Sequence, residues 1–221
     1  MARGAYTIYY DRIVMAEIKL GINQRMPLDI LHIALEQELQ GIDDVSRIEE
    51  LLRSEYQGEN RIKKAFNQIK STIKSNPLKD YLDEHKEEIL NALKSKTDRN
   101  LILTAITAAR YSFCYDVLVA FGKQFRLQDM VNSDVLCRLI GVKYGANKSV
   151  NNTLYYIIPQ LAEAQMFSRP APGEYTYLDA QQPAHKITWE IWKESYYVNE
   201  QLVSREGEDY IFHPYFRFIK E

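Results

Sequence analysis

Hydrophobic residues recur at three- and four-residue steps through most of the chain, the spacing that places side chains on one face of a helix. Residues 6–20 and 29–39 follow this period. Ser46, with Glu49 three positions later, forms a capping-box pattern that predicts a third helix ending near Gly58. The first part of the chain is therefore predicted to be helical.

Residues 60–74 predict a helix with an unusually basic surface. Asn60 is suited to cap it, and its apolar positions share one face: Ile62, Phe66, Ile69 and Ile73. The rest of its surface carries five cations with no acid between them in the sequence: Arg61, Lys63, Lys64, Lys70 and Lys74. One interpretation is that this face is only exposed to solvent. The other is that it binds an anionic partner, which the lack of balancing acids favours.

The longest apolar run, residues 100–125, is the expected centre of the core, folded as one helix or two. An amphipathic helix over residues 78–94 precedes it, and Asp98 can cap it. Residues 187–221 are rich in aromatic side chains and predict a helix, then a hairpin about Glu206, Gly207 and Glu208. Because this tail carries net negative charge, a core or a protein interface is favoured over base stacking.

Residues 133–165 predict a helix, a short turn and a second helix. Ser133 can cap the first helix, which is expected to run through Ile140 and stop at Gly141. Ser149 or Asn147 can start the second helix, which reaches about residue 165. A purely structural helix pair is the alternative to a helix-turn-helix that reads DNA.

The second helix is expected to bury one face and present another. The inward positions are Val150, Leu154, Ile157 and Leu161. The outward positions are Asn151, Asn152 and Tyr155. At its N-terminus, backbone N–H groups and the helix dipole favour a phosphate beside Lys143, Asn147 and Lys148. Pro159 counts against a straight recognition helix, but its kink falls beyond the residues expected to touch DNA.

Residues 166–169 and 174–178 are strand-like and flank the turn sequence Pro170-Ala171-Pro172-Gly173. Two helices followed by a hairpin, over about residues 133–180, is the order of a winged helix-turn-helix. In such a module the second helix enters the major groove, where asparagine can pair with adenine. The hairpin lies along the backbone, and nearby cations, Arg169 among them, supply salt-dependent affinity.

The net charge of −2 conceals a segregation of charge along the chain. Residues 36–59 hold eight acids and two bases, a net −6, and residues 163–221 hold ten acids and six bases, a net −4. Residues 61–148 hold nine acids and sixteen bases, a net +7. The middle of the chain is therefore its basic part.

The predicted fold is mainly α: a compact helical protein with a winged helix-turn-helix-like segment and short C-terminal hairpins. Residues 1–98 are expected to form an N-terminal helical region. Residues 99–221 are expected to form a helical core with the winged segment and the aromatic tail, packed with the first region as one unit.

No enzyme signature is visible in the sequence. The histidines are isolated, no HExxH or CxxC spacing occurs, and no glycine-rich phosphate loop is present, so no catalytic residue, metal ligand or cofactor is predicted. Cys114 and Cys137 are expected to be buried, reduced thiols. With no signal peptide or membrane-spanning run, the expected location is cytoplasmic.

The order of these elements resembles the BrxA family, small helical accessory proteins of bacterial BREX anti-phage systems. The likeness rests on helices first, then the run Glu59-Asn60-Arg61-Ile62-Lys63-Lys64-Ala65-Phe66, the apolar run 101–121, and residues 150–167. The resemblance implies a cytoplasmic, non-enzymatic DNA-binding component that works beside other defence proteins, including a methyltransferase. It assigns no role to any single residue.

The sequence thus predicts a double-stranded DNA-binding accessory protein of phage defence. The main alternative is a protein-interaction adaptor that uses the acidic segment near Asp43 and the aromatic tail, without direct DNA contact. An enzyme whose site is scattered through the sequence comes third.

Overall fold

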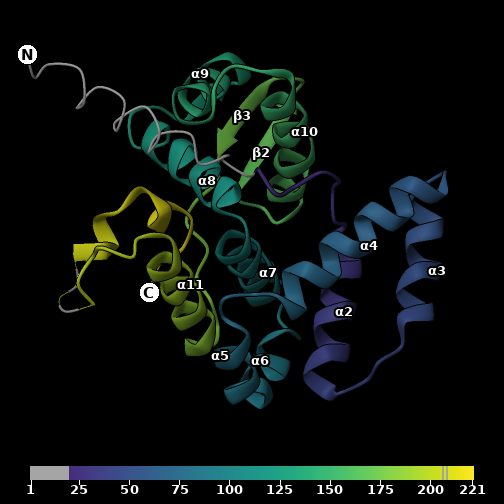
Figure 1. The fold of residues 1–221 in the computed structure, drawn as a ribbon. Helices are drawn as coiled ribbons and strands as arrows, with labels where there is room; N and C mark the ends of the chain where they lie inside the picture. The colour runs from purple at the N-terminus through teal and green to yellow at the C-terminus, as the bar shows by residue number, and fades with distance from the viewer. Residues whose placement is uncertain (1–19, 206, 208) are drawn as a thin grey trace, which may run out of the picture.

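The computed structural model describes residues 20–205, 207 and 209–221, and the helix expected over residues 6–20 lies outside them apart from Leu20 (Figure 1). The described residues form ten α-helices, three strands and two short 3-10 helices, so the protein is mainly helical, as predicted. The α-helices are α2 (Leu28–Gln40), α3 (Val45–Glu55), α4 (Glu59–Lys74), α5 (Lys79–Glu84), α6 (Lys86–Ala92), α7 (Lys96–Arg110), α8 (Ser112–Gln124), α9 (Ser133–Tyr144), α10 (Lys148–Glu163) and α11 (Lys186–Asn199). The other elements are β1 (Met130–Asn132), β2 (Phe167–Ala171), β3 (Glu174–Tyr177), η1 (Asp209–Phe212) and η2 (Pro214–Phe218).

Helix α7 lies at the centre of the molecule and is buried along most of its length (Figure 1). It packs against α2, α4, α8 and α11, and the buried side chains form one contiguous hydrophobic cluster from Ile22 to Ile219. The apolar run over residues 100–125 is two helices, α7 and α8, bent by 119°. No single helix in the described ranges is long and apolar enough to cross a membrane; only this bent pair, taken together, passes on length and composition.

Several predicted helix starts are wrong by one to three residues. Asp44, not Ser46, caps α3, because its carboxylate accepts a hydrogen bond from the Arg47 backbone N–H at 3.1 Å. Helix α4 begins at Glu59 after Gly58, before the predicted cap Asn60. In each case an earlier residue able to adopt the cap conformation begins the helix first.

Asp98 does not cap α7, and the predicted helix over residues 78–94 breaks at His85 into α5 and α6. Ser95 occupies the cap position of α7. The fully buried Asp98 carboxylate instead accepts hydrogen bonds from the backbone N–H groups of Ala184 and His185 and from the Thr188 hydroxyl, at 2.7–3.1 Å. These bonds fasten the start of α11 to α7.

The predicted C-terminal tail hairpin is wrong: residues 209–218 form η1 and η2, and the described residues around position 207 form no strand pair. The aromatic tail is mainly core, with Trp192, Tyr215 and Phe218 buried. Helix η2 lies directly on α8 at Gly122, where an added Cβ atom would be 2.0 Å from the Pro214 carbonyl oxygen. Tyr215 and Phe216 are adjacent and both buried in one core, which the alternating faces of a strand would not allow.

Residues 130–177 form a small unit of two helices and an antiparallel sheet in which β3 lies between β1 and β2. The β2–β3 hairpin is confirmed, with Gly173 at φ 80° in its turn. Strand β1, which was not predicted, pairs with β3 through Val131 and Tyr175. Asn132, not Ser133, caps α9, and the helix runs through Gly141 to end before Gly145.

Candidate nucleic-acid interface

Helix α10 has the two faces that the sequence predicts. Its inward stripe is 0–3% exposed: Val150, Leu154, Ile157 and Leu161. Its outward positions, Asn151, Asn152 and Tyr155, are all exposed, and Tyr155 is 75% exposed. A large aromatic side chain left uncovered beside two amides offers both apolar contact and hydrogen bonds to a partner.

Of the two predicted starts of α10, Asn147 is confirmed as the cap, but its side chain uses N–H groups that were expected to favour a phosphate. The Asn147 side-chain oxygen accepts hydrogen bonds from the backbone N–H groups of Ser149 and Val150, at 3.0 and 3.1 Å. These N–H groups are therefore already satisfied, and Asn147 acts as the helix cap. An anion here would meet the exposed Lys148, which forms no ion pair within the described part of the chain, and the positive end of the dipole.

Lys143 is less available than the sequence suggests. Its ammonium lies 2.7 Å from an Asp116 carboxylate oxygen, and the Tyr144 hydroxyl donates to the same carboxylate. Burial and this acidic neighbour raise the pKa of Tyr144. The three side chains join α9 to α8, so a phosphate would have to compete with Asp116 for Lys143.

Arg169 projects from β2, the strand at one edge of the sheet, and is exposed. The β2–β3 register shifts between Ser168 and Ala171, and Pro170 in this stretch has no backbone N–H to donate. The hairpin edge is thus unsuited to pairing with another strand, while its cation remains available to an anionic partner.

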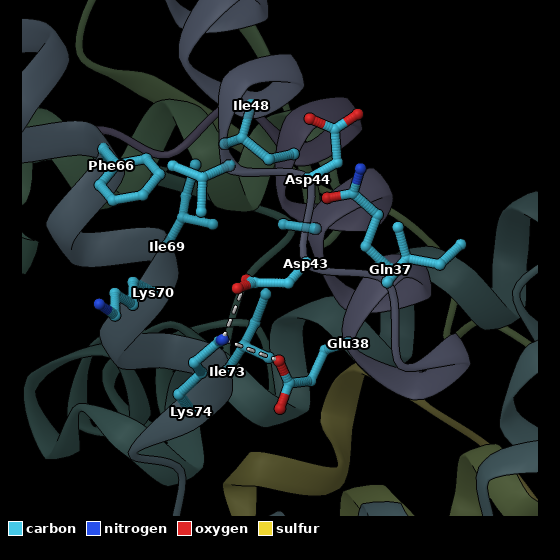
Figure 2. Close-up of a pocket in the computed structure, with 13 residues that line it drawn as sticks. Gln37, Glu38, Asp43, Asp44, Ile48, Phe66, Ile69, Lys70, Ile73 and Lys74 are labelled. Atoms are coloured by element: carbon cyan, nitrogen blue, oxygen red, sulfur yellow. Dashed lines mark ion pairs between the residues drawn. The ribbon is translucent and has the colours of Figure 1, made fainter.

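The cations of α4 lie in two different environments. Lys74 lies 3.5 Å from carboxylate oxygens of both Glu38 and Asp43, and Figure 2 shows these two ion pairs. Lys70 lines the same pocket of about 160 Å³ between α2, α3 and α4, together with Asp44. The expectation of a face without balancing acids is therefore wrong at Lys74, because the acids come from a segment distant in the sequence.

The other three cations, Arg61, Lys63 and Lys64, are exposed and form no ion pair with any residue that the structure describes. Lys64 also lines a cleft together with Ser149 and Asn152 of α10. The structure thereby brings the basic helix and the polar face of α10 to one surface, which their separation in the sequence does not indicate.

Residues 21–23 form hydrogen bonds with both of these helices. The Thr153 hydroxyl of α10 donates to the Ile22 carbonyl at 3.2 Å. Gln68 of α4 accepts from the Asn23 backbone N–H at 2.6 Å and donates to the Gly21 carbonyl at 3.0 Å. Helices α4 and α10 are thus linked through hydrogen bonds to the same short segment.

Two residues near this surface were missed in the sequence. Arg110 ends the apolar run of α7, and Asn23 precedes the first described helix; both line a second cleft that also includes Lys64. Neither residue belongs to a motif, and the packing of α7 against α4 brings Arg110 beside Ser71 of α4. A lone arginine at the end of an apolar helix is the only available signal.

The arrangement offers hydrogen-bond donors, cations and one exposed aromatic side chain. No group of three or more His, Cys, Asp or Glu side chains in the described ranges is placed to hold a metal ion. Burial raises the pKa of the Cys114 thiol, which favours its protonated form, and Cys137 is partly buried. Comparison of the chain with protein-family models, with curated proteins and with solved structures found no match.

Proposed function

We propose that the protein binds double-stranded DNA and performs no catalysis of its own. Helix α10 enters the major groove, with Asn151 and Tyr155 toward the base edges. Arg169 on the β2–β3 hairpin and Lys63 and Lys64 on α4 contact backbone phosphates, which gives affinity without sequence preference.

The observation that carries this proposal is the order of elements from α8 to β3. A helix, a strand, two helices and two strands follow one another, and the sheet order is β1-β3-β2. This is the order of a winged helix, in which the second helix of the pair reads DNA and the last two strands form the wing. The order supports a winged helix-turn-helix in which α8, α9 and α10 are the three helices.

The exposed chemistry of α10 is consistent with base reading. Amide side chains such as Asn151 can donate to and accept from an adenine edge, and Tyr155 can contact a thymine methyl group. Pro159 has no N–H to donate to the carbonyl of Tyr155, four positions earlier, so its effect on the helix reaches Tyr155 but not Asn151 or Asn152.

The resemblance to the BrxA family adds a biological setting to the proposal. On this resemblance, the proposed role is that of a cytoplasmic accessory component of BREX-type phage defence that works beside other defence proteins.

The adaptor alternative loses much of its predicted surface. In the acidic segment, Asp43 and Glu38 pair with Lys74, and Asp44 caps α3. In the aromatic tail most rings are buried, although Phe212 remains 71% exposed. A partner that binds these regions would have to displace contacts that the fold itself uses.

The direct test is fluorescence anisotropy of a labelled duplex titrated with the protein at several salt concentrations. Saturable binding that weakens steeply as salt rises supports phosphate contact, with a slope of about −0.9 per phosphate neutralised. Absence of binding at low salt would contradict the proposal and favour the adaptor.

A further inference from the structure

The cleft beside Lys64 extends in two directions. One part, of about 370 Å³, is lined by Asn67, Ser71, Arg110 and Ser112, among others. The other part, of about 380 Å³, is lined by Ser149, Asn152 and Tyr156 of α10. Gly21, Asn23 and Lys64 line both parts, so Lys64 stands where they join.

The charge of this cleft is uniformly positive. Among the described residues that line it are two cations, Lys64 and Arg110, and no aspartate or glutamate. Neither cation forms an ion pair with a described residue, in contrast to Lys74 on the same helix α4. Two uncompensated cations beside a polar cleft favour an anionic ligand.

Ser71 orients the Arg110 guanidinium and leaves some of its N–H donors unused. Its Nε–H donates to the Ser71 carbonyl and hydroxyl oxygens at 3.2 and 3.1 Å, and Nη2 donates to the same hydroxyl at 2.9 Å. No described residue accepts a hydrogen bond from Nη1. Because the guanidinium is oriented by Ser71, its outer edge is prepared to hold a planar or tetrahedral oxyanion with little loss of side-chain freedom.

The polar wall of the cleft adds further donors. Asn67 is exposed on α4, and α8 begins at Ser112 with no side chain in the described ranges capping its first turn. The positive end of the α8 dipole therefore reinforces the two cations. Lys63, the neighbour of Lys64 on α4, lines neither part of the cleft.

We propose that this cleft is a phosphate-ester site in which Lys64 and Arg110 hold the phosphate oxygens. The same chemistry fits a backbone phosphate of a nucleic acid and the phosphate of a free nucleotide. The site shares Lys64 with the proposed DNA interface and Asn152 with the exposed face of α10, but binding of a free phosphate ester can be measured without any duplex.

The test is isothermal titration of the full chain with AMP at constant ionic strength, with adenosine as the probe that lacks the phosphate. Saturable binding of AMP but not of adenosine is expected. Lys64→Gln should weaken AMP binding about tenfold, the effect of losing one charge-assisted hydrogen bond. The matched variant Lys63→Gln should bind AMP as the unmodified chain does.

A second variant guards against an indirect effect. Arg110→Gln should also weaken AMP binding at least tenfold, and its thermal melting reports whether loss of the Ser71 contacts disturbs the fold. No saturable AMP binding, or equal affinities for Lys64→Gln and Lys63→Gln, would overturn the site.

A competing duplex distinguishes the two sources of phosphate. If AMP is displaced by a duplex, the cleft holds a backbone phosphate; if AMP binding is unchanged, the ligand is a free phosphate ester. Failure of the chain to bind duplex at all would count against the proposed function. The AMP titration would then still test whether the cleft binds a phosphate ester.

Discussion

Helices α4 and α10 are each 16 residues long, and each buries one apolar stripe, yet their exposed faces differ in kind. The face of α4 carries cations, while that of α10 carries two asparagines, a tyrosine and one lysine at its start. Cations attract phosphates of any sequence, whereas amides distinguish bases. On the proposed function, one surface therefore divides affinity and discrimination between two helices whose residues line a common cleft.

The largest expected effect comes from reversing charge on α4. The double variant Lys63→Glu/Lys64→Glu should weaken duplex binding about a hundredfold at low salt and reduce the salt slope by about two, because two phosphate contacts are lost. Anisotropy titrations measure both quantities. Lys186→Glu/Lys220→Glu, which changes net charge equally at exposed positions outside the proposed interface, is the control. Equal losses of duplex affinity in both double variants would show that α4 contributes only through the net charge of the protein.

The asparagines of α10 should behave differently. Asn151→Ala and Asn152→Ala should each lower the preference for a selected site over a random duplex about tenfold, the discrimination of one bidentate amide contact. The salt slope should not change, because no phosphate contact is removed. Competition assays with selected and random duplexes make the measurement. An unchanged preference would show that α10 does not read bases.

The two helices also begin differently. The start of α10 relies on the Asn147 side chain, while α4 begins after Gly58 with no side-chain cap. Asn147→Ala should therefore lower the free energy of unfolding by about 1 kcal/mol. Gly58→Ala tests the other helix start by a separate mechanism, because Gly58 has φ 96° and alanine is strained there. Urea unfolding checks both, and no loss of stability in Asn147→Ala would contradict the cap.

The smallest expected effect is at Lys74. Because Glu38 and Asp43 already neutralise this ammonium, Lys74→Gln should change duplex affinity less than twofold at low salt. Lys63→Gln on the same helix is the matched comparison and should cost about tenfold. If the two variants weaken binding equally, the division of α4 into paired and unpaired cations is wrong.

The sequence predicted what depends on local spacing. The buried stripe of α10, its exposed asparagines and the β2–β3 hairpin follow from periodicity and turn chemistry. Helix starts were predicted less well where two cap residues lie close together, as with Asn132 and Ser133. Strand β1 was missed because three residues are too few to show an alternating pattern.

The charge environment of the site was not predictable, since it is made of long-range contacts. Asp116 of α8 reaches Lys143 of α9, and Asp43 of the loop between α2 and α3 reaches Lys74 of α4. The inclusion of Arg110 beside Lys64 depends on how α7 packs against α4, which no local pattern encodes. Counting charges along the chain therefore identified the basic region but not which of its lysines and arginines form ion pairs.

The close approach of η2 to Gly122 affects the order in which the chain acquires its structure. Helix α8 is the first helix of the proposed DNA-binding unit, and it is covered by residues made much later in synthesis. Contacts between distant segments form slowly, because a long loop must close before they contribute. A growing chain therefore leaves the side of Phe125 that meets Phe218 uncovered until Phe218 has been synthesised. During that interval the nascent protein is open to aggregation and to chaperones.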